Sequence, residues 1–132
     1  MAIYCLNDWN GRPRVEGIRL ETGVKEINGT KVLDVAGEID VYTAPQFKEA
    51  VNGIIAGGQK HLIIDMGDVT YMDSSGFGTL LSATRRLRPH GGTINLVKCN
   101  TSIDRILKIT RLNTVFATYD SVDDAIEATQ AA

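Results

Sequence analysis

Beyond residue 43, short apolar runs typical of strands alternate with segments whose apolar residues recur every three or four positions. The apolar runs are HLIIDM, TINLVK and TVFATY, and a helical segment stands before or after each of them. Strands that alternate with helices usually lie parallel, with the helices crossing over the faces of one sheet. The pattern therefore predicts an α/β domain, with HLIIDM as a central strand covered on both faces.

A hairpin is predicted ahead of this alternation. Two β-favouring stretches, LETGVKEI and TKVLDVAGEI, are separated by Asn28 and Gly29. Both turn residues accept positive φ at little cost, which makes Asn-Gly a strong hairpin signal. The sheet should thus be mixed and mostly parallel, with an antiparallel opening hairpin, about four helices and the order ββαβαβαβα.

Helix starts are expected where a hydroxyl side chain precedes a segment of helical periodicity, because such side chains can accept a free backbone N–H. In the third helix Ile103, Ile106 and Leu107 should face inward, and Asn113 can end it. The four expected starts are a capping box of Thr43 with Gln46, then Ser74 or Ser75, then Thr101 with Asp104, and last Ser121 with Asp124.

Length and composition limit the classes of function. A chain of 132 residues fits one domain, and a formal charge of −2 gives no reason to expect nucleic acid as a partner. Two cysteines cannot form a disulfide framework, which favours a reduced, cytoplasmic protein. No apolar run approaches the roughly 18 residues of a membrane span, so membrane insertion is not expected.

Catalytic and cofactor patterns are weak. The serine pair lacks the first glycine of the G-x-S-x-G elbow, and His61 and His90 stand in segments where neither is an evident base. The glycines after Ser75 do not continue into a phosphate-binding loop, and the acidic residues around position 70 fit no calcium loop. We therefore expect no catalytic residue, no cofactor and no metal site.

The serine pair itself leaves two interpretations open. One hydroxyl can cap the helix, which contributes about 1 kcal/mol. Capping needs a single hydroxyl, however, and Ser74 and Ser75 are both present. A helix N-terminus also tolerates a phosphate, because free N–H groups and the positive end of the dipole face it. The local pattern is compatible with a cap and with a phosphorylation switch.

Three segments together resemble a known family. GEIDVYTAPQF, LIIDMGDVTYMDSSGFGTLL and GGTINLVKCN are similar to the STAS domain of bacterial anti-sigma factor antagonists. The most specific piece is MDSSG between a strand and a helix. The resemblance assigns residues 18–132 to a STAS domain and leaves 1–17 as an N-terminal extension. Its Trp9 either folds back on the domain, contacts a partner or belongs to a flexible segment.

The resemblance implies a regulator of transcription and not an enzyme. Its unphosphorylated form would bind an anti-sigma factor serine kinase, thereby freeing a sigma factor, and a phosphoserine phosphatase would reset the switch. The resemblance assigns Ser74 as the phosphorylated residue and Asp40, Asp73, Ser75 and Gly76 as its surroundings. The alternative is a constitutive STAS interaction subunit of a lipid-transport or stress-signalling complex, in which the serine only caps a helix.

The charge on such a switch follows from elementary electrostatics. A phosphate on Ser74 adds roughly 1.5 to 2 negative charges at neutral pH. Asp73 is next to it in sequence, and Asp40 would lie near if the two strand ends adjoin. A partner packed against neutral Ser74 would have to desolvate that charge, so phosphorylation is expected to release the partner.

Overall fold

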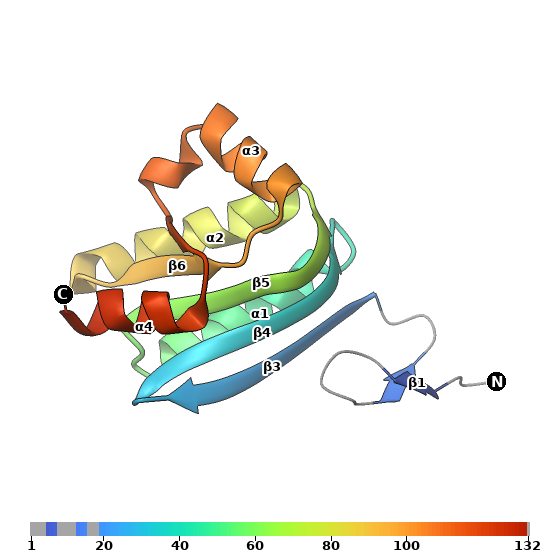
Figure 1. The fold of residues 1–132 in the computed structure, drawn as a ribbon, viewed down its shortest axis with the longest axis horizontal. Coiled ribbons are helices and arrows are strands. Elements are labelled where there is room, and N and C mark those ends of the chain that lie inside the picture. Colours follow the sequence, from blue (N-terminus) through green and yellow to red (C-terminus); the bar gives the residue numbers. More distant parts are fainter. Residues whose placement is uncertain (1–4, 8–12, 16–18, 132) are drawn as a thin grey trace.

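The computed structural model describes residues 5–7, 13–15 and 19–131 (Figure 1). From residue 19 onward the elements follow the predicted order ββαβαβαβα, which confirms the fold class. Short 3-10 turns at Arg88–His90 and Leu112–Thr114 interrupt two of the connections. The main elements are β3 (Leu20–Ile27), β4 (Thr30–Ile39), α1 (Ala44–Ala56), β5 (His61–Met72), α2 (Ser74–Leu87), β6 (Thr93–Val97), α3 (Thr101–Ile109), β7 (Ala117–Tyr119) and α4 (Val122–Ala131).

Two further short strands precede this domain. β1 (Cys5–Asn7) and β2 (Pro13–Val15) pair antiparallel with each other in a separate two-stranded sheet. Trp9, between them, lies outside the described residues. The boundary at residues 17 and 18 stays a prediction.

The main sheet has five strands in the order β3-β4-β5-β6-β7. β3 and β4 are antiparallel, whereas each later pair is parallel, and β5 is the central strand as predicted. The hairpin turn is confirmed, because Asn28 and Gly29 have φ of 52° and 80°. The carboxyl ends of the parallel strands consequently meet at one edge of the sheet.

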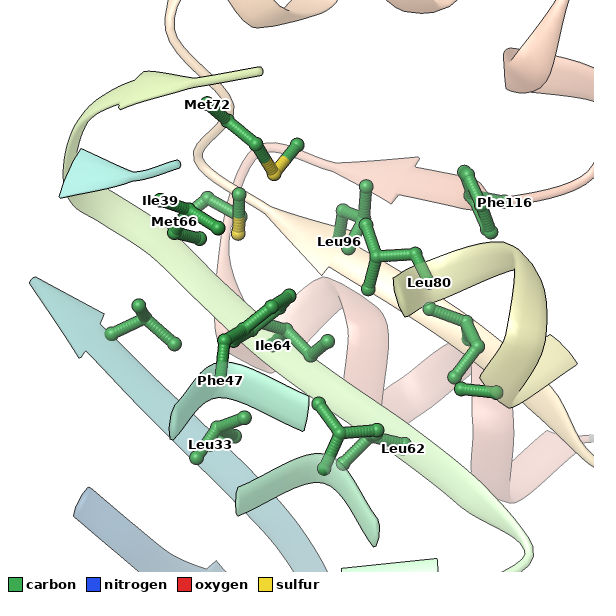
Figure 2. Packing of buried hydrophobic residues seen from close by; sticks show 14 of the residues in the cluster. Leu33, Ile39, Phe47, Leu62, Ile64, Met66, Met72, Leu80, Leu96 and Phe116 are labelled. Atoms are coloured by element: carbon green, nitrogen blue, oxygen red, sulfur yellow. The ribbon is translucent and has the colours of Figure 1, made fainter. Parts of the chain in front are cut away.

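The two faces of the sheet carry cores of different size. α1, α2 and α3 pack on one face, where Leu33, Ile64 and Phe47 belong to the larger cluster. α4 covers the other face through a smaller cluster that includes Ile63 and Val97. Figure 2 shows Ile39, Met66 and Met72 together at one end of the larger core. That end lies where β4 and β5 lead into the helices.

β5 is longer than the predicted strand HLIIDM, since it continues to Met72. Its pairing with β4 shifts register twice, between Asp34 and Ala36 and between Gly37 and Glu38. Each shift places one extra residue in β5, as in a β-bulge. Buried residues therefore recur at a spacing of three, Met66, Val69 and Met72, instead of alternating.

Three details of α3 differ from the prediction, and the first is that Asn100 caps the helix in place of Thr101, since its Oδ1 accepts the N–H of Ile103 at 2.9 Å. The helix ends at Ile109 and not near Asn113, because Arg111 takes a left-handed conformation with φ 61°. Ile106 is 38% exposed, so of the three predicted residues only Ile103 and Leu107 face inward.

For α4 the predicted start is confirmed, since Ser121 Oγ accepts the N–H of Asp124 at 3.1 Å. In the part of the chain that the structure describes, no helix is long and apolar enough to cross a membrane.

Candidate functional site

The carboxyl ends of β4 and β5 bring the predicted site residues into one neighbourhood. Ile39 and Met72 pair in register, and the N–H of Asp73 donates to the carbonyl of Ile39 at 3.0 Å. The chain then leaves both strands at the same edge, with Asp40 following Ile39 and Ser74 following Asp73. The segments 40–43 and 73–76 therefore start side by side.

Asp73, and neither serine, caps α2. Its backbone is extended (φ −99°, ψ −171°), and its Oδ1 accepts the N–H of Ser75 at 2.8 Å. The expectation that a serine hydroxyl caps this helix is therefore wrong, and Ser75 contributes its backbone N–H instead. The carboxylate is a better cap here because it also complements the positive end of the helix dipole. Ser74, the first helical residue, is exposed.

Gly76 lets the start of α2 lie directly against the strand ends. A Cβ at this position would stand 2.5 Å from Cγ of Met72 and 2.8 Å from Cγ2 of Ile39. Both distances are far below van der Waals contact, so no larger residue fits without displacing the core. The glycine thereby fixes how closely Ser74 and Ser75 approach the end of β4.

Asp40 and Thr43 form the reciprocal pair that was predicted for Thr43 and Gln46. Asp40 Oδ1 accepts the N–H groups of Thr43 and Tyr42 at 3.0 and 2.9 Å, while Thr43 Oγ1 accepts the N–H of Asp40 at 2.9 Å. The predicted capping box is wrong, because Thr43 makes no side-chain cap of α1 and Gln46 donates to the carbonyl of Leu20 at 3.1 Å. The helix still begins at the predicted place.

Arg19, which no sequence pattern indicated, forms ion pairs with two acidic residues, Glu38 and Asp40. Its Nη2 lies 2.9 Å from Oε2 of Glu38 and 2.5 Å from Oδ2 of Asp40. Its carbonyl accepts the N–H of Glu38 at 2.9 Å, an approach permitted by Gly37, whose φ is 114° and whose Cβ would stand 2.1 Å from that oxygen. Arg19 is remote from Asp40 in sequence, so only the β3–β4 pairing brings them together.

Asp40 is a buried carboxylate held in its charged form. Burial by itself raises its pKa, but the N–H groups of Thr43 and Tyr42 and the positive charge of Arg19 lower it further than burial raises it. The pKa of Asp40 therefore lies below its ordinary value. The Arg19 guanidinium in turn has its pKa raised by its hydrogen bond to Glu38 and by the charge of Asp40.

Neither histidine lies near Ser74. His61 opens β5 and Ser74 follows the end of that strand, so the strand's whole length separates them. His90 follows the far end of α2. A serine needs a base within hydrogen-bonding distance to act as a nucleophile, and neither histidine can serve. Ser74 is exposed at a helix N-terminus, where free N–H groups can stabilise an anion.

Exposed apolar side chains border the same edge. Val41 and Tyr42 are 63% and 81% exposed, and Tyr71, near the end of β5, is 51% exposed. Asp40 and Thr43, on either side of the first two, are 8% exposed each. The turn is therefore anchored at both ends while its two central side chains project into solvent.

Comparison with known proteins identifies the family to which this fold belongs. The STAS domain family matches residues 22–125. An anti-sigma-B factor antagonist of Bacillus subtilis is 31% identical over 98 residues, which cover 74% of this chain and 89% of that protein. A crystal structure of an anti-sigma factor antagonist from Mycobacterium paratuberculosis has a TM-score of 0.77 and 30% identity, covering 84% of this chain and 94% of the other.

A more distant structure shares the fold. The Bacillus cell fate determinant SpoIIAA, solved in its phosphorylated form, has a TM-score of 0.65 at 21% identity, and the match covers 83% of this chain and 99% of SpoIIAA. The family match, residues 22–125, includes the ends of β4 and β5 and the start of α2. The chain belongs to the STAS domain family, among the bacterial anti-sigma factor antagonists.

Proposed function

We propose that this chain is an anti-sigma factor antagonist whose activity is switched by phosphorylation of Ser74. Unphosphorylated, it binds an anti-sigma factor serine kinase in the bacterial cytoplasm and so frees a sigma factor. Phosphorylated, it releases the kinase until a phosphoserine phosphatase resets it. The observation that carries this proposal is the exposed Ser74 at the first position of α2, next to Asp73 and on a segment that starts beside the one carrying Asp40.

Groups around the start of α2 would both stabilise and repel a phosphate on Ser74. N–H groups of the first turn and the positive end of the dipole stabilise an anion at this position. Asp73 and Asp40 oppose it through charge repulsion, although Arg19 already neutralises part of the charge on Asp40. The domain can therefore carry the phosphate in water and remain folded. SpoIIAA, a protein of the same fold solved in phosphorylated form, supports this expectation.

A bound partner changes that balance. A kinase surface packed against neutral Ser74 would have to cover a dianion after modification, and an uncompensated buried charge costs several kcal/mol. A loss of about 3 kcal/mol weakens binding more than a hundredfold. Release of the partner, with no unfolding of the antagonist, is the expected consequence.

The test combines labelling with calorimetry. The protein is incubated with ATP and each anti-sigma factor kinase of its own genome, and any phosphate is mapped by mass spectrometry. The affinity of the modifying kinase is then measured for Ser74→Ala, Ser74→Asp and, as a matched control, Ser75→Ala. We expect phosphate on Ser74 and binding by Ser74→Asp at least a hundredfold weaker than by Ser74→Ala.

Two results would contradict the proposal. Equal affinity of Ser74→Asp and Ser74→Ala would mean that charge at this position does not control binding. Phosphate on Ser75 with Ser74 unmodified would move the switch to the neighbouring residue. If no kinase modifies or binds the chain, the constitutive STAS subunit is the better interpretation, and Asp73 then serves only to begin a helix.

A further inference from the structure

The turn 40–43 presents the most exposed large hydrophobic side chain of the described residues. Tyr42 is 81% exposed and its neighbour Val41 is 63% exposed. Aromatic residues are enriched at the centres of protein interfaces, where they contribute much of the binding free energy. An aromatic ring left almost entirely in water is therefore a candidate contact for a partner.

The backbone beneath Tyr42 is held rigidly. Its N–H donates to Oδ1 of Asp40 at 2.9 Å, and the N–H of Thr43 donates to the same oxygen at 3.0 Å. Thr43 Oγ1 also donates to the carbonyl of Glu38 at 2.8 Å, which fastens the turn to the last residues of β4. A side chain on a preorganised backbone loses less conformational entropy when it binds, so the turn is suited to an anchoring role.

Arg19 stabilises this turn from outside. Its guanidinium is 46% exposed and reaches Oδ2 of Asp40, whose side chain is only 11% exposed. The two oxygens of Asp40 thus have separate tasks, one holding the turn and the other binding Arg19. Without the guanidinium, a nearly buried carboxylate would lose its cationic partner, and the turn built on it would be less well ordered.

We propose that Tyr42 is the main apolar anchor for the anti-sigma factor kinase and that Arg19, acting through Asp40, is the residue that positions it. This inference rests on the proposed function. The occupant is assigned from continuity, because the turn leaves the sheet beside the segment that carries Ser74. A partner that covers Ser74 reaches Tyr42 on the same edge, and it must offer an apolar pocket there.

Calorimetry against the kinase identified above tests the anchor. Tyr42→Ala should weaken binding by about thirtyfold, the effect typical of a central aromatic contact. Ile109→Ala is the matched control, since Ile109 is 74% exposed but lies at the end of α3, and it should bind within twofold of the wild type. Tyr42→Ala binding within twofold, while the wild type binds well, would overturn the anchor and leave the proposed function intact. Failure of the wild type to bind any kinase would overturn both.

Carboxyl NMR titration tests the positioning role on the protein alone. Arg19→Met should raise the pKa of Asp40, broaden the amide signals of Tyr42 and Thr43, and weaken kinase binding about fivefold. Arg19→Lys should recover most of the affinity, because a cation again faces Asp40. Arg105→Met, a change at an exposed residue of α3, should alter none of the three. An unchanged pKa of Asp40 in Arg19→Met, or lost affinity that Arg19→Lys does not recover, would overturn the positioning role.

Discussion

The starts of α2 and α3 are built alike but have different surroundings. Each follows a parallel strand, each is capped by an acid or amide side chain, and each begins with two hydroxyl residues. Asp73 accepts the N–H of Ser75, and Asn100 accepts the N–H of Ile103 at 2.9 Å. Thr101 is exposed to solvent, as Ser74 is. The local motif alone therefore does not distinguish a phosphorylation site from an ordinary helix start.

The third residue of each helix makes the difference. α2 has Gly76, where an added Cβ would clash with Met72 and Ile39, whereas α3 has Ile103, whose side chain is buried. The start of α2 also adjoins the turn anchored by Asp40. The start of α2 therefore differs from that of α3 in having a glycine packed against the strand ends and in adjoining the turn that Asp40 anchors.

The largest contrast is expected in phosphorylation. Ser74→Ala should abolish phosphate transfer from the cognate kinase, and Thr101→Ala should leave it at the wild-type level, because only the first hydroxyl lies on the proposed kinase surface. Incorporation of labelled phosphate measures both. Substantial labelling of Ser74→Ala would show that the two helix starts are equivalent to the kinase.

The close approach at Gly76 should be the most sensitive structural feature. Gly76→Ala adds a Cβ that would clash with the side chains of Met72 and Ile39. It should therefore lower the free energy of unfolding by about 2–3 kcal/mol. Gly78→Ala is the matched control two residues on, where a Cβ meets nothing within 4 Å, and it should stabilise the helix by about 0.5–1 kcal/mol. Urea denaturation measures both changes. Equal effects of the two substitutions would show that the close approach at Gly76 does not limit the size of its side chain.

The two caps should differ by a smaller amount. Asp73→Ala removes one cap and should cost about 1 kcal/mol. Asn100→Ala should cost about 2 kcal/mol, because its Nδ2 also donates to the carbonyl of Val69 at 3.1 Å and that bond is lost as well. The free energies of unfolding from urea titrations decide the order. A greater loss for Asp73→Ala would mean that the charged cap matters more than the link to β5.

The smallest contrast is expected in how the stability of the two regions depends on pH. Asp40 has a folded pKa below its ordinary value, so its contribution to stability is present above the unfolded pKa of about 3.9 and is lost as the pH falls through the folded pKa. The destabilisation caused by Asp40→Asn should therefore be visible at pH 7 and shrink below about pH 4. The loss in Asn100→Ala, an amide, should stay constant over that range. Unfolding free energies at both pH values provide the test.

The sequence predicted the elements better than their ends. The alternation of strands and helices and the Asn28–Gly29 turn depend on local patterns, and both are confirmed. The helix caps depend on which of several polar side chains reaches a given N–H. Asp73 and Asn100 cap α2 and α3, and the predicted hydroxyl residues that follow them do not. The cap residue has an extended backbone, whereas Ser74 and Thr101 are already the first residues of their helices.

The site was predictable only in part. The resemblance pointed to Asp40 and Asp73, and the register of Ile39 with Met72 does bring their chain segments together. Arg19 gave no signal, because its partner Asp40 is reached only through the pairing of β3 with β4. Tyr42 stood in a quoted motif, but its exposure depends on the bonds that Asp40 makes to the turn.

The two extra residues of β5 have a consequence for where Ser74 points. Between the pairs Val32–Ile63 and Ile39–Met72, β5 has two more residues than β4. Val69, which lies between the two shifts, is buried in the same core as Met66 and Met72, so each extra residue is absorbed by a bulge and the inward-facing phase of β5 is kept. If the register of Asp34 with Asp65 continued without these bulges, Thr70 would pair with Ile39 in place of Met72, and Ser74 would start two residues further along, out of alignment with the end of β4. The switch could thus be destroyed by a change in strand length alone, with every residue of the site still present.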